Sequence, residues 1–369
     1  MSVHDSIPPG CEPTCHGCRH RHLEPAESLE QKTAHLAHRL ARWCDVLAPV
    51  QAVPAARRLG YRDRVTLNAR WDAQQGWRFG LMRRDELIAI PDCPVHSRRI
   101  NTFLALLRAT LPPADGFPLA YVHVSGAQAT LILKAHRFVE GDLTKLVAGL
   151  DDSGLDGCWV HCHPAAGRKL FARRGWHLLW GREHSRDEQG LQHGPTAFRQ
   201  LLPELHAASV QAALAHLQPQ PGVAVLDLYC GIGATLRHWT AQGAEALGIE
   251  LAGGAVSATL LNAPAAQVLR GTCVQRLPQI EAWWNTQPGA RVLYVNPPRS
   301  GLESELAEAI CERLRPDRMA YLSCSAGTLA RDLDRLVDAG YRVDRLMPFD
   351  FFPLTHHVEC LALLTRRVA

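Results

Sequence analysis

The hydrophobic pattern at the start of the chain changes from no period to a helical one. Residues 1–25 are rich in Pro, Cys and His and show no periodicity, so something other than a helix or strand must order them. Apolar residues then recur at helical spacing within 26–47, which predicts an amphipathic helix. The segment 48–60 contains prolines and a glycine and is predicted to be a connector. The apolar residues of the helix are Leu29, Leu36, Leu40 and Trp43.

From Tyr61 the pattern changes to short strands with one helix among them. Gln75-Gly76 marks a turn between the two clearest strands. This pattern predicts a small α+β domain, which ends in the polar, glycine-containing stretch 181–195. The predicted strands lie at 65–67, 77–80, 118–124, 129–135 and 158–162, and the predicted helix lies at 97–111.

After Pro195, helices alternate with apolar strands of the buried type. This alternation predicts an α/β domain with a mostly parallel, helix-covered sheet. The chain is therefore divided into residues 1–60, 61–190 and 191–369. In the last part a helix is predicted at 203–217, and strands at 223–228, 246–250, 291–295, 318–323, 341–347 and 357–365.

Composition places the protein among ordinary globular chains. Hydrophobic residues make up 47% and charged residues 21% of the 369 residues, which excludes wholesale disorder. No stretch approaches the roughly 18 apolar residues of a membrane span, and the N-terminus shows no secretory signal. With 12 cysteines and no such signal, we expect a reducing cytoplasm, where cysteines more often serve metal binding or catalysis.

Net charge changes this picture little. A charge of +4 permits nucleic-acid binding without indicating it. Only four of the 40 basic residues are lysines, and arginine suits phosphate contacts. Genome composition explains an arginine excess equally well.

A glycine loop after the strand at 223–228 is the first candidate for ligand binding. The loop Asp227–Gly233 precedes a helix, and its glycines allow the backbone to approach a ligand at the helix N-terminus. Glu250 lies about 20 residues farther along, where an acidic residue binds ribose hydroxyls in nucleotide sites. Because position 236 is Leu236 rather than glycine, an adenosyl ligand fits better than a dinucleotide. The alternative is a tight turn with a chance carboxylate.

Three further segments place polar side chains at strand ends. Two prolines hold Asn296 at the end of its strand, in either a binding loop or a rigid surface loop. Cys324 follows another strand, and a helix opens at Ser325–Thr328; a thiol there is expected to have a lowered pKa, unless it is an inert core cysteine. Glu359 enters an apolar strand, where burial would raise the pKa of its carboxyl and suit it to act as a base.

Histidine and cysteine groups raise the question of metal binding. Cys11, Cys15 and Cys18 with the distant Cys93 suit a [4Fe-4S] cluster or a tetrahedral zinc ion. The pair His356-His357 and the tract 161–163 are weaker candidates, because neighbouring residues on a strand point to opposite faces.

In combination and in this order, the segments resemble the RNA 5-methyluridine (uracil-C5) methyltransferases. Asn296, where many relatives have Asp, looks most like the branch that modifies 23S ribosomal RNA. The resemblance implies a class I, Rossmann-like methyltransferase domain over residues 191–369. The matching pieces are DLYCGIG, GIE, NPPRSG, YLSCSAGTLARDL and DFFPLTHHVE, with the helix-start segment Phe198-Arg-Gln200.

The resemblance also implies a mechanism. The Cys324 thiolate would add to uracil C6, C5 would take the methyl group of S-adenosylmethionine, and Glu359 would remove the C5 proton. The target uridine would have to leave its stack. The residues expected around S-adenosylmethionine are Gln200, Tyr229, Gly231, Gly233, Glu250 and Asn296.

The family likeness favours the [4Fe-4S] cluster over zinc, with Cys93 completing it and joining the first two parts of the chain. The first gap, Cys11-x3-Cys15, is shorter than in many relatives. The central part, 61–190, is expected either to contact RNA through its arginines or to serve as a scaffold. A monomer is favoured.

Some positions depart from the family pattern. They are Leu202, Ala234 and Thr272-Cys273, where relatives carry polar or acidic side chains, and they put adenine contacts in doubt. Two other functions therefore stay open. One is the same chemistry on tRNA, and the other is a catalytically silent RNA-binding or folding factor.

Overall fold

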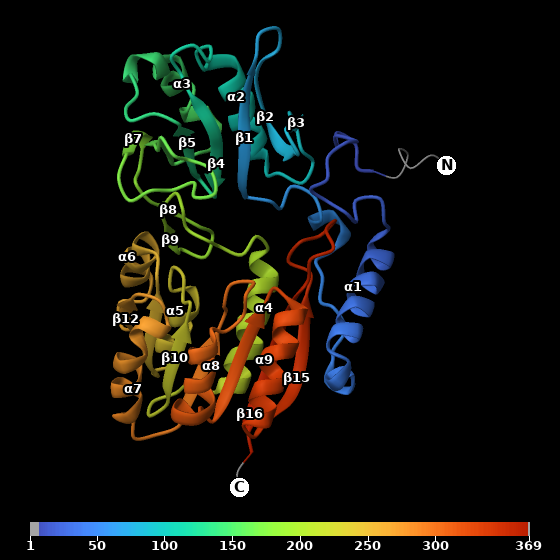
Figure 1. Cartoon of the computed structure of the whole chain (residues 1–369), viewed down its shortest axis with the longest axis vertical. Coiled ribbons are helices and arrows are strands. Elements are labelled where there is room, and N and C mark those ends of the chain that lie inside the picture. Colours follow the sequence, from blue (N-terminus) through green and yellow to red (C-terminus); the bar gives the residue numbers. More distant parts are fainter. Residues whose placement is uncertain (1–6, 368–369) are drawn as a thin grey trace. The chain divides into compact units, whose positions relative to one another are not determined.

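The computed structural model describes residues 7–367 and divides the chain into two compact units. Unit 1 contains residues 7–23 and Pro54–Ala197, and unit 2 contains Glu24–Val53 and the chain from Phe198 onward (Figure 1). The cysteine-rich segment and the helix that follows it, which the sequence analysis groups in residues 1–60, therefore lie in different units.

Unit 1 is built on a seven-stranded sheet in the order β3-β2-β1-β4-β5-β6-β7. Neighbouring strands are antiparallel except β5 and β6, which are parallel. The strands are β1 Arg64–Asp72, β2 Gly76–Arg83, β3 Glu86–Ala89, β4 Leu119–Ser125, β5 Gln128–Leu133, β6 Gly157–Cys162 and β7 Trp176–Gly181, with the short pair β8 Ser185–Arg186 and β9 Gln192–His193. The helices are α2 Arg98–Thr110 and α3 Thr144–Ala148.

One face of this sheet forms the core of unit 1. Val65, Leu67 and Ala69 alternate with outward-facing residues along β1, and they share a buried cluster with Phe103 and Leu107 of α2. The strands expected from the sequence are present in this sheet. The sequence did not predict β3 and β7, because β3 is only four residues long and β7 is apolar without alternation.

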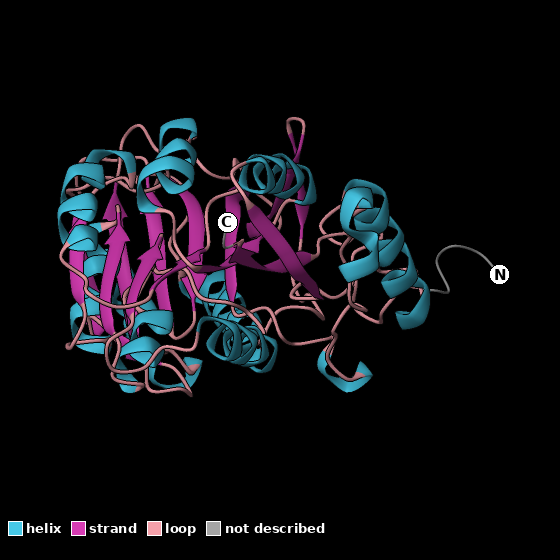
Figure 2. Ribbon diagram, turned by 90° about the horizontal axis from the view of Figure 1, so that it is seen from below, coloured by secondary structure: helices cyan, strands magenta, loops and turns pink. Residues whose placement is uncertain are grey.

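Unit 2 is built on a second seven-stranded sheet, in the order β12-β11-β10-β13-β14-β16-β15. The strands from β12 to β14 are parallel, and β16 is antiparallel to both of its neighbours. Helices lie on both faces of the sheet (Figure 2). The mostly parallel, helix-covered sheet predicted for this region is confirmed. No helix in the described ranges is long and apolar enough to cross a membrane.

The strands of unit 2 are β10 Ala224–Leu228, β11 Glu245–Glu250, β12 Gln267–Arg270, β13 Arg291–Val295, β14 Arg318–Ser323, β15 Tyr341–Phe349 and β16 Glu359–Arg366. Its helices are α1 Pro25–Arg39, α4 Pro203–Leu217, α5 Ala234–Ala241, α6 Gly253–Asn262, α7 Leu277–Asn285, α8 Ser304–Ala309 and α9 Ala326–Asp338. The predicted bounds of α4 agree with the structure residue for residue, and proline occupies its first turn, where no amide donor is needed.

The helix predicted at 26–47 is shorter in the structure and ends in a different geometry. The α-helix stops at Arg39, and the chain continues as a 3₁₀ segment over Ala41–Val46. Leu36, Leu40 and Trp43 nevertheless share one buried cluster with the sheet of unit 2. The apolar spacing therefore identifies the buried face, although the helix does not continue along all of it.

A buried ion pair fixes α1 to the C-terminal part of unit 2. Lys32 Nζ lies 2.5 Å from Asp350 Oδ1, and both side chains are almost fully buried. The same ammonium group donates a hydrogen bond to the carbonyl of Phe352 at 3.3 Å. Lys32 therefore holds the segment that leads from β15 into β16.

We expect Lys32→Met to lower the free energy of unfolding by about 3–5 kcal/mol, because it leaves the Asp350 carboxylate buried without a cation. The measurement is urea denaturation at neutral pH. Lys32→Met/Asp350→Leu removes both charges and should recover much of the loss. Arg42→Ala, which breaks an exposed pair with Asp334, is the control and should change stability by less than about 1 kcal/mol. Equal effects of Lys32→Met and Arg42→Ala would show that burial of the pair is unimportant.

Candidate active site

The topology of unit 2 brings the predicted site residues to one edge of its sheet. The loops that begin at Tyr229, Asn296 and Cys324 follow the neighbouring parallel strands β10, β13 and β14, so they leave the sheet at the same edge. Open α/β sheets bind their ligands at this edge. Strand β16 runs in the opposite direction and therefore begins there, at Glu359.

Strand register sets Glu359 opposite Cys324. Ser323 of β14 pairs with Cys360 of β16, so one further step along the two antiparallel strands reaches these two residues. The charge of Glu359 acts on the Cys324 thiol. The structure thus brings together the two side chains that the sequence analysis assigns to catalysis.

The pKa of the Cys324 thiol is raised above its ordinary value. Burial is the main cause, and the negative charge of Glu359 adds to it, while the guanidinium of Arg299 beside the sulfur works in the opposite direction. The expected lowering by the helix N-terminus is therefore wrong for the free protein, because burial and the carboxylate outweigh it. The helix itself begins as predicted, with the Ser325 hydroxyl accepting a hydrogen bond from the Thr328 amide at 3.5 Å.

Arg299 is a residue that the sequence analysis missed. It follows Asn296 in the proline loop, and its positive charge lowers the pKa of both Cys324 and Glu359. Its position in the NPPRSG block, three residues after Asn296, could have identified it as a site residue. Arg299 favours the charged forms of both reactive groups.

Glu359 is buried, with 4% of its surface exposed, and its carboxyl has a pKa raised to about 7. Burial causes the increase, and a hydrogen bond from Gln200 Nε2 to its Oε2 at 3.1 Å partly offsets it. The predicted raised pKa is confirmed. Gln200, expected beside the cofactor, is bonded to Glu359, and its Oε1 is buried without a hydrogen-bond partner among the described residues.

The glycine loop and Glu250 meet at the same edge. Gly231 and Gly233 both have positive φ, at 57° and 79°, and a Cβ at Gly233 would come within 2.7 Å of the Thr259 side chain. Glu250 Oε2 accepts a hydrogen bond from the Gly231 amide at 3.1 Å, and its Oε1 accepts one from Ala252 at 2.7 Å. The carboxylate predicted to bind a ribose therefore lies against the glycine loop.

Asp227, near the end of β10, stabilises this loop through hydrogen bonds to α5. Its Oδ2 accepts hydrogen bonds from Thr235 Oγ1 at 2.6 Å and Trp239 Nε1 at 2.8 Å, both on α5. Full burial raises the pKa of the carboxyl to about 7. The start of α5 is thereby fixed to the end of β10.

The positions that depart from the family pattern all belong to unit 2, and two of them, Leu202 and Cys273, are buried. Leu202 is fully buried at the start of α4, and Ala234 opens α5. Cys273 is buried beside the Tyr229 phenol, which donates a hydrogen bond to Glu303 Oε2 at 2.5 Å. Tyr229 thus lies at the expected edge, but its hydroxyl is already bonded to a protein carboxylate.

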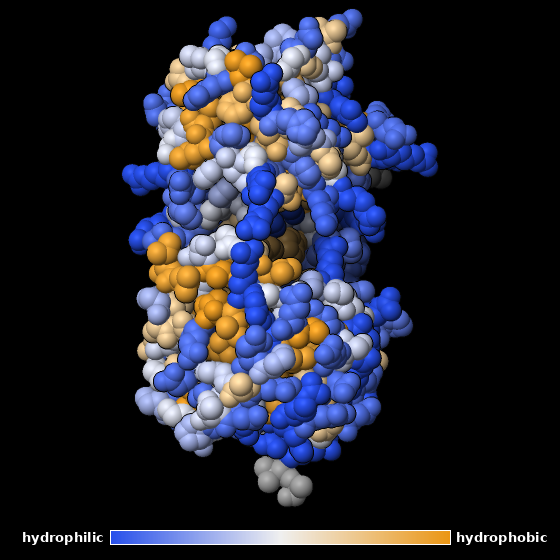
Figure 3. All heavy atoms as spheres, turned by 60° about the vertical axis from the view of Figure 1, so that its left-hand side comes forward, coloured by the Kyte–Doolittle hydropathy of each residue, from blue (hydrophilic) through white to orange (hydrophobic). Residues whose placement is uncertain are grey.

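Apolar side chains are exposed on the segment that follows Glu250. Leu251 is 60% exposed, and Leu260 and Leu261 at the end of α6 are 55% and 54% exposed. Figure 3 shows hydrophobic patches on the surface among hydrophilic side chains. Glu250, the carboxylate predicted to bind a ribose, is therefore followed directly by an exposed apolar side chain, Leu251.

The four cysteines that the sequence predicts for a metal centre, Cys11, Cys15, Cys18 and Cys93, all belong to unit 1. The pKa of the Cys18 thiol is raised to about 11 by burial and by the charges of Cys93, Cys15 and Cys11. The pKa values of the Cys93 and Cys11 thiols are also raised, mainly by burial. Among residues 7–367, however, no group of three or more His, Cys, Asp or Glu residues has a geometry that could hold a metal ion, and this applies to the four cysteines as well as to both histidine tracts.

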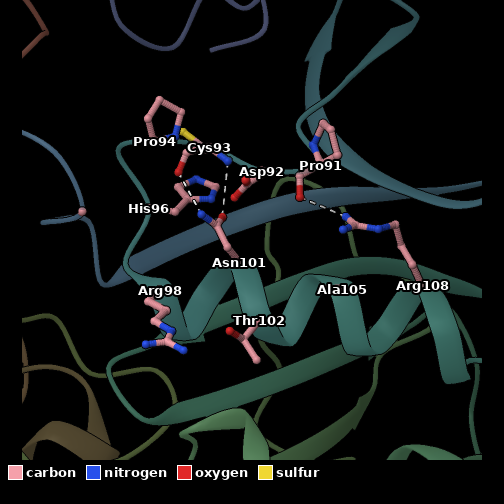
Figure 4. A pocket seen from close by; sticks show the side chains of 11 residues that line it. Pro91, Asp92, Cys93, Pro94, His96, Arg98, Asn101, Thr102, Ala105 and Arg108 are labelled. Carbon is pink, nitrogen blue, oxygen red and sulfur yellow. Dashed lines mark hydrogen bonds between the residues drawn. The ribbon is translucent and has the colours of Figure 1, made fainter. Parts of the chain in front are cut away.

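Side chains hold the cysteine segments in place. Asn101 Oδ1 accepts a hydrogen bond from the Cys93 amide at 3.3 Å, and Asn101 Nδ2 donates one to the Cys93 carbonyl at 3.0 Å (Figure 4). Arg21 donates hydrogen bonds to the carbonyls of Glu12 and Cys15. A cavity of about 630 Å³ lies beside Cys93. Both backbone segments that carry the thiols are therefore held by hydrogen bonds from polar side chains.

The chain resembles known RNA methyltransferases in sequence. A family model described as tRNA (Uracil-5-)-methyltransferase matches residues 274–367. The chain is 32% identical over 368 residues to 23S rRNA (uracil(1939)-C(5))-methyltransferase RlmD of Pseudomonas entomophila, covering 95% of this chain and 77% of that protein. It is 30% identical to the protein of the same name from Hahella chejuensis, covering 98% of this chain and 84% of the relative.

The fold has a solved counterpart. A crystal structure of Pyrococcus abyssi tRNA (uracil-54, C5)-methyltransferase in complex with S-adenosyl-L-homocysteine superposes with a TM-score of 0.72, at 20% identity. The match covers 96% of this chain and 86% of the other. The class I methyltransferase fold is thus confirmed.

We expect Glu359→Gln to stabilise the protein relative to the parent at pH 8 but not at pH 5. A carboxyl whose pKa is raised on folding contributes stability below its ordinary pKa and loses it as the pH rises through about 7. The difference in unfolding free energy should therefore increase by about 2 kcal/mol between these pH values. Chemical denaturation at several pH values measures it. Glu305→Gln, on the exposed surface of α8, is the control, and a matching pH dependence in both variants would contradict burial of Glu359 as the cause.

Proposed function

This chain belongs to the RNA uracil-C5 methyltransferase family, and from that premise we propose that it methylates C5 of a uridine in 23S ribosomal RNA with S-adenosylmethionine. The observation that carries the proposal is the placement of Cys324 opposite Glu359 at the sheet edge that also holds the glycine loop. A soft nucleophile and a separate base are what this reaction needs.

The first step makes uracil C5 nucleophilic. The Cys324 thiolate forms a bond to C6, and the electron pair of the C5–C6 double bond moves toward C4 and its oxygen as an enolate. Since burial and Glu359 raise the pKa of this thiol, Arg299 is the side chain that favours the thiolate. We therefore assign Arg299 to stabilising the nucleophile.

The second and third steps complete the substitution. C5 attacks the methyl carbon of S-adenosylmethionine, the carbon–sulfur bond breaks, and S-adenosylhomocysteine leaves. The Glu359 carboxylate then takes the C5 proton, the double bond forms again, and the Cys324 thiolate is released. With a pKa of about 7, Glu359 can accept a proton near neutral pH and return it to water. The hydrogen bond from Gln200 orients this carboxylate.

We assign the methyl donor to the glycine loop and its neighbours. Gly231 and Gly233 would let the backbone approach the donor, and Glu250 would bind its ribose hydroxyls. The exposed Leu251 offers an apolar contact for the adenine ring where the family's polar residues are replaced. Asn296 and Tyr229 would complete the site from the ends of β13 and β10.

The choice of 23S ribosomal RNA rests on the relatives of highest similarity reported above and on Asn296 in the proline loop. Methylation of tRNA is the second candidate, favoured by the description of the matching family model. A silent RNA-binding factor accounts less well for the chain, because both reactive side chains are present and the base has a raised pKa.

We also propose that Cys11, Cys15, Cys18 and Cys93 hold a [4Fe-4S] cluster, with zinc as the alternative. Support comes from the donor set, since all four are free thiols of unit 1 whose charges act on one another. The cluster would supply a covalent link between residues 7–23 and the loop before α2. A free thiol nucleophile and such a cluster both suit a reducing, cytoplasmic location. We propose that the protein acts as a monomer.

We expect Cys324→Ala to lower methyl transfer by more than about 10³-fold, because it removes the thiol that is proposed to add to C6. Labelled S-adenosylmethionine, 23S ribosomal RNA and tRNA are incubated separately with the protein, and the digested RNA is examined for 5-methyluridine. Calorimetry should show unchanged binding of S-adenosylmethionine. Cys311→Ala, in the helical turn Ile310–Leu314 that follows α8, is the control for loss of a thiol. Product on tRNA alone would reject the ribosomal substrate, and no product on any RNA from folded protein would reject the enzyme.

We expect anaerobically purified protein to absorb near 400 nm and to contain about four iron atoms per chain. Cys93→Ser should lose most of this absorbance, while Cys44→Ser, an exposed cysteine of unit 2, should keep it. Metal analysis distinguishes the cluster from zinc, which gives a colourless protein with about one ion per chain. Full absorbance in Cys93→Ser would show that Cys93 is not a ligand.

A further inference from the structure

Unit 1 carries a concentration of positive charge that the proposed chemistry does not use. It lies on two loops, 134–139 and 163–175, which follow β5 and β6. Because these strands are parallel, both loops leave the sheet at the same edge, where β7 also begins. We call six residues on these loops the cationic edge: Lys134, Arg137, Arg168, Lys169, Arg173 and Arg174.

The charges of the cationic edge are exposed and uncompensated. All six side chains are exposed, and the two loops contain no aspartate or glutamate. None of the six forms an ion pair within residues 7–367, whereas the exposed Arg42, Arg313 and Arg342 each contact a carboxylate. Six neighbouring cations without counter-charges repel one another, and a polyanion relieves that repulsion.

A buried histidine fixes the longer loop in a defined conformation. His161 Nε2 accepts a hydrogen bond from the Ala172 amide at 2.9 Å, and its Nδ1 lies 3.2 Å from the Gly175 carbonyl. Both ring nitrogens are therefore occupied by the loop, which explains the histidine in the tract 161–163 without a metal. The cations of this loop are presented from a preorganised backbone, and preorganisation lowers the entropic cost of binding.

Aromatic rings lie among the cations. Trp176 stacks on His161 at 4.1 Å between centroids and on Phe171 at 5.6 Å. Phe138 of the other loop meets His177 edge to face at 5.3 Å. Phe171, Trp176 and Phe138 are only partly buried, and His177 is exposed. Partly exposed aromatic rings beside cations suit unstacked nucleobases and their phosphates.

The outer face of the sheet extends the positive charge toward β1 and β2. Arg70 and Arg78 are directly opposite each other in the strand register, where like charges destabilise a pair. Asp72, the acidic residue at this turn, attracts Arg78 through its charge, and its Oδ1 accepts hydrogen bonds from the amides of Gln74 and Gln75 at 2.9 Å, so it offsets only part of the positive charge. A bound phosphate would remove the repulsion between the two arginines.

We propose that the cationic edge and the rings of Phe171 and His177 form a binding surface for a single-stranded segment of the RNA substrate. The phosphates contact the six cations, and unpaired bases stack on the aromatic side chains. The proposal rests on the proposed function in that it takes RNA as the substrate, and it identifies unit 1 as a source of RNA affinity separate from the reactive groups of unit 2.

The test compares two variants with the same change in net charge. Arg168→Gln/Lys169→Gln/Arg173→Gln/Arg174→Gln removes four cations of the edge. Arg83→Gln/Arg84→Gln/Arg182→Gln/Arg186→Gln removes four exposed arginines from the end of β2 and from the segment after β7, at the opposite edge of the same sheet. Binding of a fluorescein-labelled oligouridine to the full chain is measured by anisotropy at several salt concentrations, and S-adenosylmethionine binding is measured by calorimetry.

We expect the first variant to bind the oligouridine more than about tenfold more weakly and to reduce the salt slope by about 2–3, since each lost phosphate contact on a single strand contributes about 0.7. The control should stay within about twofold of the parent. A third variant, Phe171→Leu, should bind about three- to tenfold more weakly with an unchanged salt slope, because stacking does not release counterions.

Equal losses in both charge variants, or no loss in the first, would overturn the proposal. These results are independent of catalysis. A protein that methylates no RNA but binds the oligouridine through the cationic edge would contradict the proposed function and leave this surface intact. Unchanged binding of S-adenosylmethionine in every variant shows that unit 2 remains folded.

Discussion

The antiparallel pairing of β16 with β14 is the constraint on which the active site depends. The strands β10, β13 and β14, which lead into the other site loops, run parallel to one another and end at the site edge. Only a strand of opposite direction can begin there, and this reversal is what places Glu359 opposite Cys324. The segment 350–358 therefore turns back at this edge, from the end of β15 into the adjacent strand β16, and its position decides where β16 begins. The buried Lys32–Asp350 pair fixes the start of this segment to α1.

Burial gives the two reactive groups related properties. It raises the pKa of the Cys324 thiol and of the Glu359 carboxyl, and the negative charge of Glu359 raises the pKa of the thiol further. A carboxyl with a pKa of about 7 is a useful base near neutrality, whereas the thiol needs help to ionise. One cation, Arg299, lies close enough to act on both groups. The same buried surroundings thus raise the pKa of the base to a useful value and make ionisation of the nucleophilic thiol dependent on Arg299.

The sequence predicted the fold of unit 2 well, because its signals are local. Pro203 and the apolar spacing after it define α4, and short apolar runs define the buried strands. It also assigned Cys324 and Glu359 to one site through the resemblance. The Lys32–Asp350 pair could not be predicted, since its partners are separated by most of the chain and no local pattern links the helix that carries Lys32 to the segment that begins at Asp350. The pKa of Cys324 was mispredicted for a related reason: the helix start is local, but burial and the opposing carboxylate come from tertiary structure.

The reaction requires little positive charge in unit 2 because it moves negative charge rather than accumulating it. The charge of the thiolate passes to the enolate, and transfer of a methyl group from a sulfonium then neutralises it. Only afterwards does a second negative group, the Glu359 carboxylate, give up its charge by accepting the proton. One arginine is therefore sufficient at the reacting atoms. The polyanionic backbone of an RNA substrate has the opposite requirement, since many phosphates must be matched at once. Placing exposed cations on unit 1 and a single arginine beside the buried pair satisfies both requirements without adding charges that would lower the pKa of Glu359 and weaken it as a base.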